Sequence, residues 1–423
     1  MRTNGMGEPV NEVQWPLGNV PAGPLAGTAV PAVIGVGDLR TANAAAVLAT
    51  IRSAREAPRV SEVAAVTKLS RPTVEVIVED LLASGLIEDA PMPSARGQRS
   101  PGRPARRLRF RPQAAYVVGV DVRAGSVSAC IADLTGQRAG TVRHTVARDV
   151  TGAERAKAVS AVVAEAMAEA KVRVSRVCAA TVGTPGWVQD NRRVRYVTNL
   201  RDWADVDIVG ILGAELRCPV AVENDANLGA LGERAARSAA TADDMIFLLL
   251  GERLRAGIIT GGRLMRGFHG AAGEVGFMVF PDGSPLAARA IGDPGAARPG
   301  INPRGVFADA DAAGGAAAGD PASVEMLHAV GVRIAEAMAP VLLTLDPAEV
   351  VLGSSLFAVP GQAAATDAVL GAAAARSADM LVDQPIWRLS QLGDEAVLAG
   401  AVEFALAAAE QVLATRPTNL LRR

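Results

Sequence analysis

Hydrophobic residues recur at helical spacing between residues 38 and 90, and in short extended runs from residue 116 onward. In the first part, the spacing predicts a helix over 41–55, a second short helix capped by Ser61, and a third that begins after Ser70 and ends at Gly85. Two strands, at 86–88 and 106–110, follow the third helix. Three short helices and a β-hairpin are typical of a winged helix-turn-helix, although any small helical bundle has a similar pattern.

The third helix is the candidate recognition helix. Ser70 caps it, so Arg71 and Thr73 project from its first turn, where they could meet phosphates and base edges in a major groove. Glu75 and Glu79 weigh against a purely electrostatic contact. Glu75 either accepts a hydrogen bond from a cytosine amino group or belongs to a solvated face.

A basic segment without a single acid lies between residues 94 and 112. It contains Arg96, Arg99, Arg103, Arg106, Arg107, Arg109 and Arg111. Its Pro101–Pro104 stretch resembles the core of an AT-hook, in which an extended backbone lets arginine enter a narrow minor groove. A flexible basic linker is the alternative, and either possibility favours a polyanionic partner. The predicted DNA-binding residues are therefore Ser70, Arg71, Thr73, Arg99, Arg103, Arg106 and Arg107.

The extended runs after residue 116 predict a duplicated α/β fold. Strands at 116–121, 127–133 and 141–146, a long helix at 153–171 and a strand at 177–182 follow the order of a ribonuclease-H-like half. A second half begins at 245–250 and returns through 257–259. Duplication of this unit makes a cleft, and the two halves join near the helix that follows residue 224.

Asp225 stands where a β-branched strand, 219–224, meets that helix. A carboxylate on a rigid element there could accept a proton from a substrate hydroxyl, as the base of a phosphotransferase must. Asp is also a common N-cap residue, which is the simpler interpretation.

Composition narrows these options. The net charge of -1 conceals the local basic segment, and 3% aromatic residues leave few stacking platforms for single-stranded nucleic acid. Cys130, Cys178 and Cys218 have no paired spacing, which suits buried thiols in a reducing cytoplasm, and no apolar run predicts a membrane span. The expected division is a disordered tail (1–36), a winged helix-turn-helix domain (37–93), an arginine-rich linker or wing (94–114) and a two-lobed domain (115–423).

Several motifs together resemble the ROK family of bacterial repressors and sugar kinases, which have an actin-like ATPase fold. They include Val182–Gly186, Asn199-Leu200 followed by Trp203, Glu223–Asn227, Gly270–Gly276, Leu345–Pro347 and Leu392–Asp394. The resemblance runs from about residue 39 to about residue 408 and includes a repressor-type N-terminal winged helix, which the family's kinases lack. It implies that Asp225 is at the general-base position and that Asn199, Asn224, Asp225 and Glu274 are the ligand-binding residues.

The departures from the family pattern concern phosphate and zinc. The first phosphate loop lacks its Gly-Gly pair and reads Asp121–Gly125, and the second reads Gly251–Gly257 with Glu252 and Arg255 where the family keeps bare backbone. Phe277 replaces a histidine that binds sugar and zinc, and residues 281–303 contain no cysteine. We therefore expect no metal, no ATP cofactor and no catalytic residue.

These features predict a DNA-binding transcriptional regulator, most simply a repressor, that senses a sugar-like effector through a catalytically degenerate sugar-kinase fold. Its expected partners are operator DNA, a small sugar-like molecule and a second copy of itself, as a homodimer or homotetramer in the cytoplasm, with no membrane. An ATP-dependent sugar kinase that uses Asp225, and a regulator that has lost sugar binding, are the alternatives.

Overall fold

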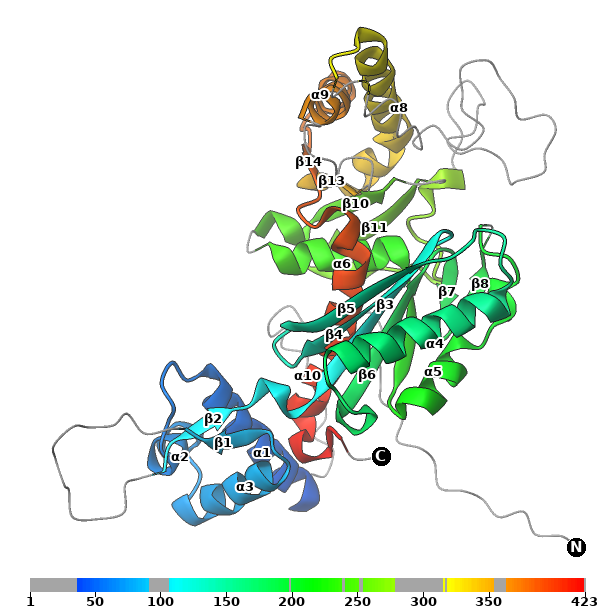
Figure 1. Cartoon of the computed structure of the whole chain (residues 1–423). Coiled ribbons are helices and arrows are strands. Elements are labelled where there is room, and N and C mark those ends of the chain that lie inside the picture. The colour runs from blue at the N-terminus through cyan, green and yellow to red at the C-terminus, as the bar shows by residue number, and fades with distance from the viewer. Residues whose placement is uncertain are drawn as a thin grey trace, which may run out of the picture.

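The computed structural model describes residues 36–90, 106–197, 199–237, 240–250, 254–277, 315, 318–353 and 363–421. The predicted disordered tail, apart from Val36, lies outside these residues, as do Arg96, Arg99 and Arg103 of the basic segment. The described chain forms a small N-terminal unit and two α/β lobes (Figure 1).

The N-terminal unit is a winged helix-turn-helix. Its elements are α1 (Val36–Ser53), α2 (Val60–Thr67), α3 (Arg71–Ala83), β1 (Ile87–Asp89) and β2 (Leu108–Phe110). The two strands pair antiparallel, with Ile87 opposite Phe110, and so form the predicted wing. Four apolar residues of α3, Val74, Ile77, Val78 and Leu81, lie on one face and are buried, so this helix packs against its neighbours along that face.

The helix boundaries in this unit follow the capping chemistry, with one correction. The Ser70 Oγ accepts the backbone N–H of Thr73 at 3.3 Å, as predicted for the N-cap of α3. For α2 the predicted cap is wrong, because Arg59 and not Ser61 is the N-cap. The carboxylate of Glu62 accepts the Arg59 N–H at 2.7 Å and fixes that end.

Each α/β lobe is built on a five-stranded sheet. The first sheet has the order β5-β4-β3-β6-β9, and the second has the order β12-β11-β10-β13-β14. In both, the first three strands along the chain are antiparallel and the later two join them in parallel. The predicted duplication of a ribonuclease-H-like unit is confirmed.

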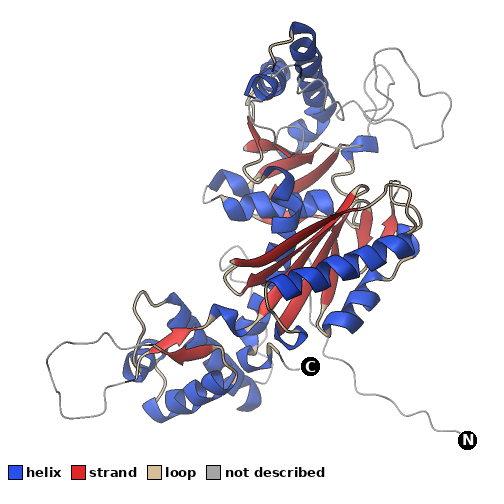
Figure 2. Ribbon diagram, in the orientation of Figure 1, coloured by secondary structure: helices blue, strands red, loops and turns tan. Residues whose placement is uncertain are grey.

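The elements of the first lobe are β3 (Tyr116–Val122), β4 (Ser126–Asp133), β5 (Arg138–Thr145), α4 (Gly152–Glu169), β6 (Val177–Thr184), β7 (Trp187–Gln189), β8 (Arg193–Tyr196), α5 (Ile208–Leu216) and β9 (Val220–Asn224). Those that follow are α6 (Asp225–Ala236), β10 (Met245–Leu249), β11 (Arg255–Thr260), β12 (Arg263–Met265), α8 (Pro321–Leu345), β13 (Glu349–Gly353), α9 (Ala363–Met380), β14 (Ile386–Leu389) and α10 (Ala396–Thr415). Short 3-10 turns connect several of them, including one at Val275–Phe277 and one at Gly393–Glu395. Figure 2 shows the helices on both faces of each sheet.

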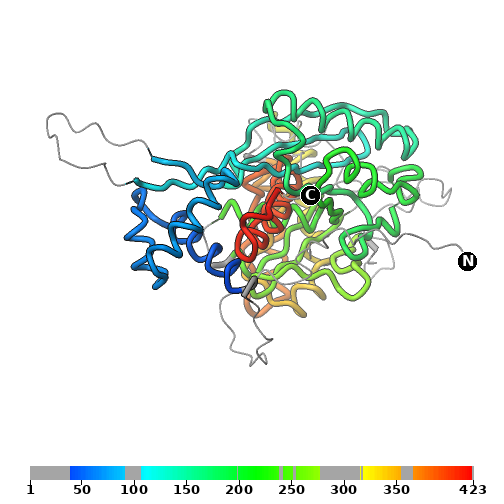
Figure 3. Tube along the Cα trace, turned by 90° about the horizontal axis from the view of Figure 1, so that it is seen from below, coloured from blue at the N-terminus to red at the C-terminus, as the bar shows by residue number. Residues whose placement is uncertain are grey.

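The helix α10 ties the three units together. Its first part packs on α6 and its middle part on β3 and β6, while its last turns contact α1. Gly400 allows the close crossing with α6, because a Cβ there would lie 1.8 Å from the carbonyl oxygen of Leu228. Figure 3, seen from below, places the red C-terminal helix between the blue winged helix and the rest of the chain.

Two helices, α8 and the segment from Gly393 to Thr415, are long and apolar enough to cross a membrane by composition. The expectation that no apolar run predicts a membrane span did not anticipate these two helices. In the fold, 67% of the apolar window in the second is buried, as in the core helix of a soluble domain. The apolarity of this helix is explained by its packing on α6, β3, β6 and α1.

Candidate functional site

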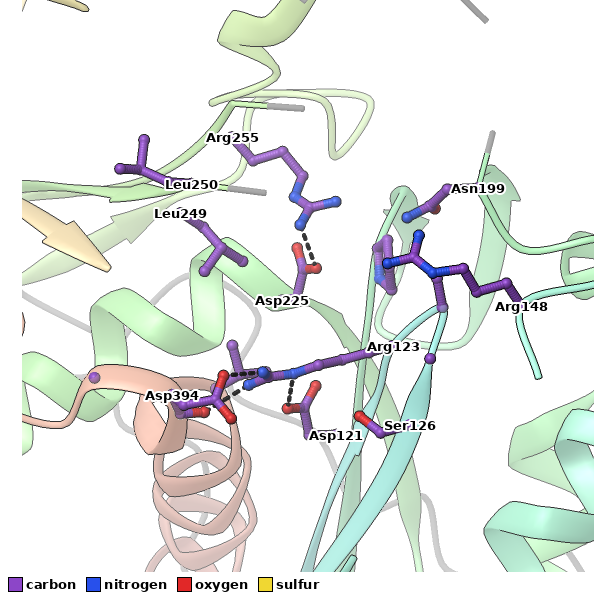
Figure 4. A pocket seen from close by; sticks show the side chains of 15 residues that line it. Asp121, Arg123, Ser126, Arg148, Asn199, Asp225, Leu249, Leu250, Arg255 and Asp394 are labelled. Carbon is purple, nitrogen blue, oxygen red and sulfur yellow. Dashed lines mark hydrogen bonds and ion pairs between the residues drawn. The ribbon is translucent and has the colours of Figure 1, made fainter. Parts of the chain in front are cut away.

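A pocket of about 380 Å³ lies between the two lobes. Its lining comes from seven places in the chain: the β3–β4 turn, the segments after β5, β6 and β8, the start of α6, the β10–β11 hairpin and the start of α10. The lining residues are Asp121, Arg123, Ala124, Gly125, Ser126, Arg148, Pro185, Asn199, Asp225, Leu249, Leu250, Arg255, Gly393, Asp394 and Val397. Figure 4 shows the charged side chains that converge on it.

Asp225 is the first residue of α6 and is 4% exposed. The interpretation of Asp225 as an N-cap is wrong, because Asn224 holds that position and its Oδ1 accepts the N–H groups of Ala226 and Asn227. The Asp225 carboxylate faces the pocket, where its Oδ2 lies 3.0 Å from Nη2 of Arg255. The candidate general base is therefore paired with a guanidinium group from the opposite lobe.

Arg123 occupies the floor of the pocket beside the start of α10. Its Nε donates to Asp121 at 2.6 Å, and its two other nitrogens donate to the carboxylate and the carbonyl oxygen of Asp394. Burial alone would lower the pKa of Arg123, but the charges of Asp121 and Asp394 outweigh it and the pKa is raised. Arg123 therefore stays charged and bridges two carboxylates (Figure 4).

The two carboxylates respond differently to this bridge. Burial raises the pKa of Asp121, even though Arg123 opposes the shift. For Asp394, burial has a raising effect that the positive charges of Arg123 and Arg143 outweigh, so the pKa is lowered. Arg143 reaches the same carboxylate at 2.5 Å, so that two arginines of the first lobe hold the segment that leads into α10.

A buried arginine supports the β3–β4 turn from behind. Arg155 on α4 is 0% exposed, and its Nη1 donates to the backbone carbonyls of Arg123, at 2.6 Å, and Ala124, at 3.1 Å. Burial lowers the pKa of Arg155. The turn is thus fixed by a side chain that the sequence analysis did not single out.

The predicted ligand-binding residues divide into two groups. Asn199 and Asp225 both line the pocket. Asn224 lies next to Asp225, but its amide Nδ2 donates to the carbonyl of Gly186 at 2.9 Å. Glu274 lies in the loop after β12 and does not line this pocket, and Phe277 ends the short turn that follows it.

The winged helix carries a second concavity, of about 630 Å³, between α2, α3 and the wing. Arg71 and Arg106 line it, and both are held by acids. The Arg71 guanidinium bonds Glu75 at 2.9 Å, and Arg106 bonds Glu79 at 2.7 Å. These pairs are exposed, and exposed ion pairs contribute little, so the arginines could exchange their acids for phosphates at small cost.

The remaining predicted DNA-binding residues have mainly structural partners or lie outside the described residues. Ser70 and Thr73 share the cap of α3, with their hydroxyl groups 2.7 Å apart. Arg107 donates to the carbonyl of Ala57 at 2.7 Å and so ties the wing to the segment before α2. The described chain does not include Arg99 and Arg103.

Residues 117–291 match a protein-family model that is described as the ROK family. Among curated relatives, a xylose repressor of Bacillus spizizenii is 26% identical over 52% of this chain and 56% of its own length. A glucokinase of Streptomyces coelicolor is 32% identical over 39% of this chain and 50% of its own. The chain is therefore similar to ROK proteins over residues 117–291. It spans only about half the length of the curated relatives that it matches.

Solved structures of ROK proteins share the fold. A ROK family transcriptional regulator, described as a homolog of the E. coli MLC protein, covers 91% of this chain with all of its own, at a TM-score of 0.64 and 18% identity. A ROK family glucokinase from Streptomyces griseus, in complex with glucose and AMPPNP, covers 69% of this chain at a TM-score of 0.56 and 24% identity. ROK proteins therefore include both regulators and kinases of this architecture.

Sequence reasoning missed the connections of three residues in the pocket. Arg123 and Arg255 stood out only as departures from glycine-rich loops, and Asp394 only as part of a family motif. The sequence did carry a signal for Arg123 and Arg255. Each lies in a loop where the family keeps bare backbone beside the phosphates, so a charged side chain there is placed at the cleft. Nothing in the local sequence pairs Arg123 with a residue 271 positions away.

Proposed function

We propose that the chain is a DNA-binding transcriptional repressor that senses a sugar or sugar derivative in the pocket between its lobes. Two curated relatives from Bacillus species carry the name xylose repressor. The winged helix-turn-helix is the module that would read an operator half-site with α3. The predicted domain limits, at residues 37, 94 and 115, are part of this proposal.

The path of α10 is the observation that carries the proposal. Val397, in its first turn, lines the pocket, and Glu410, in its fifth, bonds Arg52 of α1 at 2.7 and 2.5 Å. The intervening helix is apolar and largely buried, and twenty residues of α-helix span about 30 Å. A ligand that moves the start of α10 would therefore bias the orientation of the winged helix.

The same pocket is poorly suited to phosphoryl transfer. A general base must be free to accept a proton, but the Asp225 carboxylate is paired with Arg255. Arg123 fills the floor where a glycine-rich turn would expose backbone N–H groups to phosphates. We therefore propose that Asp225 accepts a ligand hydroxyl without catalysing its transfer.

DNA binding is tested with a gel-shift titration of the full chain on the DNA upstream of its own gene. We expect specific binding that weakens as salt rises, because phosphate contacts release counterions. Arg71→Ala should weaken binding and reduce the salt slope by about 1, as the loss of one phosphate contact does. Arg195→Ala, an exposed arginine on β8, is the matched control. Binding that is undetectable, or indifferent to salt, would contradict the proposal.

A sugar kinase is the second candidate, and the position of Asp225 at the pocket favours it. It predicts ATP turnover with a hexose that disappears in Asp225→Asn. Absence of turnover in the unmodified chain, with DNA binding intact, leaves the regulator as the function of this fold.

A regulator that has lost sugar binding altogether would bind DNA and ignore every sugar. This version is motivated by Phe277, which replaces a sugar-binding histidine of the family, and by the lack of cysteines in residues 281–303. Residues 281–303 lie outside the described part of the chain. Whether or not the regulator binds sugar, we propose that it acts in the cytoplasm as a homodimer or homotetramer, which binds paired operator half-sites. Equilibrium ultracentrifugation checks the oligomer, and a sedimenting monomer would contradict it.

A further inference from the structure

A buried carboxylate just before α6 accepts hydrogen bonds from three parts of the chain. Glu223, in β9, is 2% exposed. Its Oε1 accepts the backbone N–H of Asn224 at 2.8 Å and the side-chain amide of Asn227 at 3.0 Å. Its Oε2 accepts the side-chain amide of Asn191, from the β7–β8 turn, at 3.0 Å and Nε of Arg266, from the segment after β12, at 2.6 Å. These four hydrogen bonds use the full acceptor capacity of a carboxylate.

Arg266 joins the second lobe to this carboxylate. It follows β12, and its carbonyl oxygen accepts the N–H of Ala272 at 3.1 Å, so its backbone belongs to a closed loop of the second lobe. The loop reaches the first lobe, because a Cβ at Gly270 would lie 2.0 Å from the carbonyl oxygen of Val188 in β7. The side chains of Arg266 and Glu223 are only 19% and 3% exposed. Their separation would leave a buried carboxylate without its cation, so the pair resists separation.

The Arg266 guanidinium also lies over an aromatic ring of α10. Its central carbon is 5.5 Å from the ring centroid of Phe404, which is 4% exposed. A guanidinium group within about 6 Å of a ring centroid makes a cation–π contact. Phe404 lies about two helical turns before Glu410, which bonds Arg52 of the winged helix. Arg266 therefore starts from the backbone of the second lobe and contacts both the first lobe and the helix that leads to the winged helix.

We propose that Arg266 is a positioning residue, which passes a shift of the second lobe to the middle of α10 and so sets the DNA affinity of the winged helix. This inference rests on the proposed repressor function and adds a route that does not use the pocket residues at the start of α10. The backbone of Arg266 moves with the second lobe, while Glu223 in the first lobe holds its Nε. A rotation between the lobes therefore turns the guanidinium plane over the Phe404 ring, and α10 responds where it leads toward Glu410.

The DNA affinity of full-chain variants tests the inference without an effector. Arg266→Lys keeps a charge beside Glu223 but lacks the planar group, and Phe404→Leu keeps an apolar side chain but lacks the ring. On the DNA upstream of the chain's own gene, we expect each variant to change the Kd by about threefold or more, in the same direction. The double variant should change the Kd no more than the larger single change, because both substitutions remove one contact. Arg263→Lys, at an exposed arginine of β12, is the matched control and should leave the Kd unchanged.

A purely structural role would lower the stability of the variants without changing the Kd of the folded chain. An unchanged Kd in Arg266→Lys and Phe404→Leu, or additive changes in the double variant, would therefore overturn the inference. Amide hydrogen exchange examines the same contact without DNA. Exchange in the last turns of α10 should be faster in both variants and unaltered in Arg263→Lys, and unaltered exchange in both variants would also overturn the inference. Faster exchange in the variants of a chain that does not bind DNA specifically would instead overturn the proposed function and support the link from Arg266 to α10.

Discussion

The two hairpins that face each other across the pocket are topological equivalents with different arginines. In the first lobe, β3 and β4 pair up to Val122 and Val127, and Arg123 follows at the turn. In the second, β10 and β11 pair up to Leu249 and Arg255. Each hairpin thus sends one guanidinium group toward the same pocket (Figure 4).

Their surroundings set the two arginines apart. All three nitrogens of the Arg123 guanidinium donate to Asp121 or Asp394, and its carbonyl accepts from the buried Arg155. Among the described residues, the Arg255 guanidinium bonds only Asp225, and its buried Nε has no acceptor. Arg123 therefore has the surroundings of a structural residue that links the first lobe to α10. Arg255 has those of a ligand-binding residue, because one of its buried donors has no acceptor.

The largest expected effect comes from breaking the tie at Arg123. Arg123→Met leaves Asp121 buried without its charge partner and Asp394 with Arg143 alone, so we expect a loss of about 3 kcal/mol in the free energy of unfolding. Urea denaturation followed by circular dichroism measures it. Adding Asp121→Asn to this variant should recover part of the loss, because the unpaired buried charge is gone. A single variant as stable as the unmodified chain would show that Arg123 ties nothing.

A smaller loss is expected at Arg255. Asp225 also loses its charge partner in Arg255→Met, but it remains at the first position of α6, where its Oδ1 accepts the N–H of Ala226 at 2.8 Å. A helix N-terminus stabilises a carboxylate, so we expect a cost of about 1–2 kcal/mol in the same denaturation experiment. Equal losses for Arg123→Met and Arg255→Met would erase the difference between the two hairpins.

The elements of both hairpins were predictable from sequence, but their side-chain partners were not. Strands such as 116–121 and 245–250 are continuous apolar runs, which is the local signature of a buried strand, and Gly85 and Ser70 mark helix ends by local chemistry. The pairing of Arg123 with Asp394 depends on how α10 packs on β3. These two elements are separated by most of the chain, so no local pattern predicts their contact. The same reason explains the missed role of Arg155, whose burial is set by tertiary packing and gives no periodic signal.

Variants at the C-terminal end of α10 test whether a change near Arg123 is transmitted to the winged helix. Arg52 and Glu410 form a two-bond ion pair there, with side chains 27% and 44% exposed. A double-mutant cycle with Arg52→Met and Glu410→Gln should give a coupling of about 0.5–1 kcal/mol in the unfolding free energy. Glu410→Gln should also weaken the response of DNA binding to effector while leaving DNA affinity nearly unchanged. An unaltered response would mean that the signal takes another route.

The smallest expected effect is a pH dependence at Asp394. Because its pKa in the folded chain is lowered from 3.8, its ion pairs stabilise the fold above that value, and this contribution is lost as the pH falls through the lowered pKa. Burial raises the pKa of Asp121, so its contribution to the pH dependence of stability has the opposite sign. The experiment must therefore change Asp394 alone. Asp394→Asn should be less stable than the unmodified chain near neutral pH, and the gap should narrow below pH 3.8, by less than about 1 kcal/mol for so partly exposed a group. Urea midpoints of both proteins at several acidic pH values measure the gap. A gap that stayed constant or widened on acidification would mean that Arg123 does not depend on the charge of Asp394, and the contrast with Arg255 would then rest on Asp121 alone.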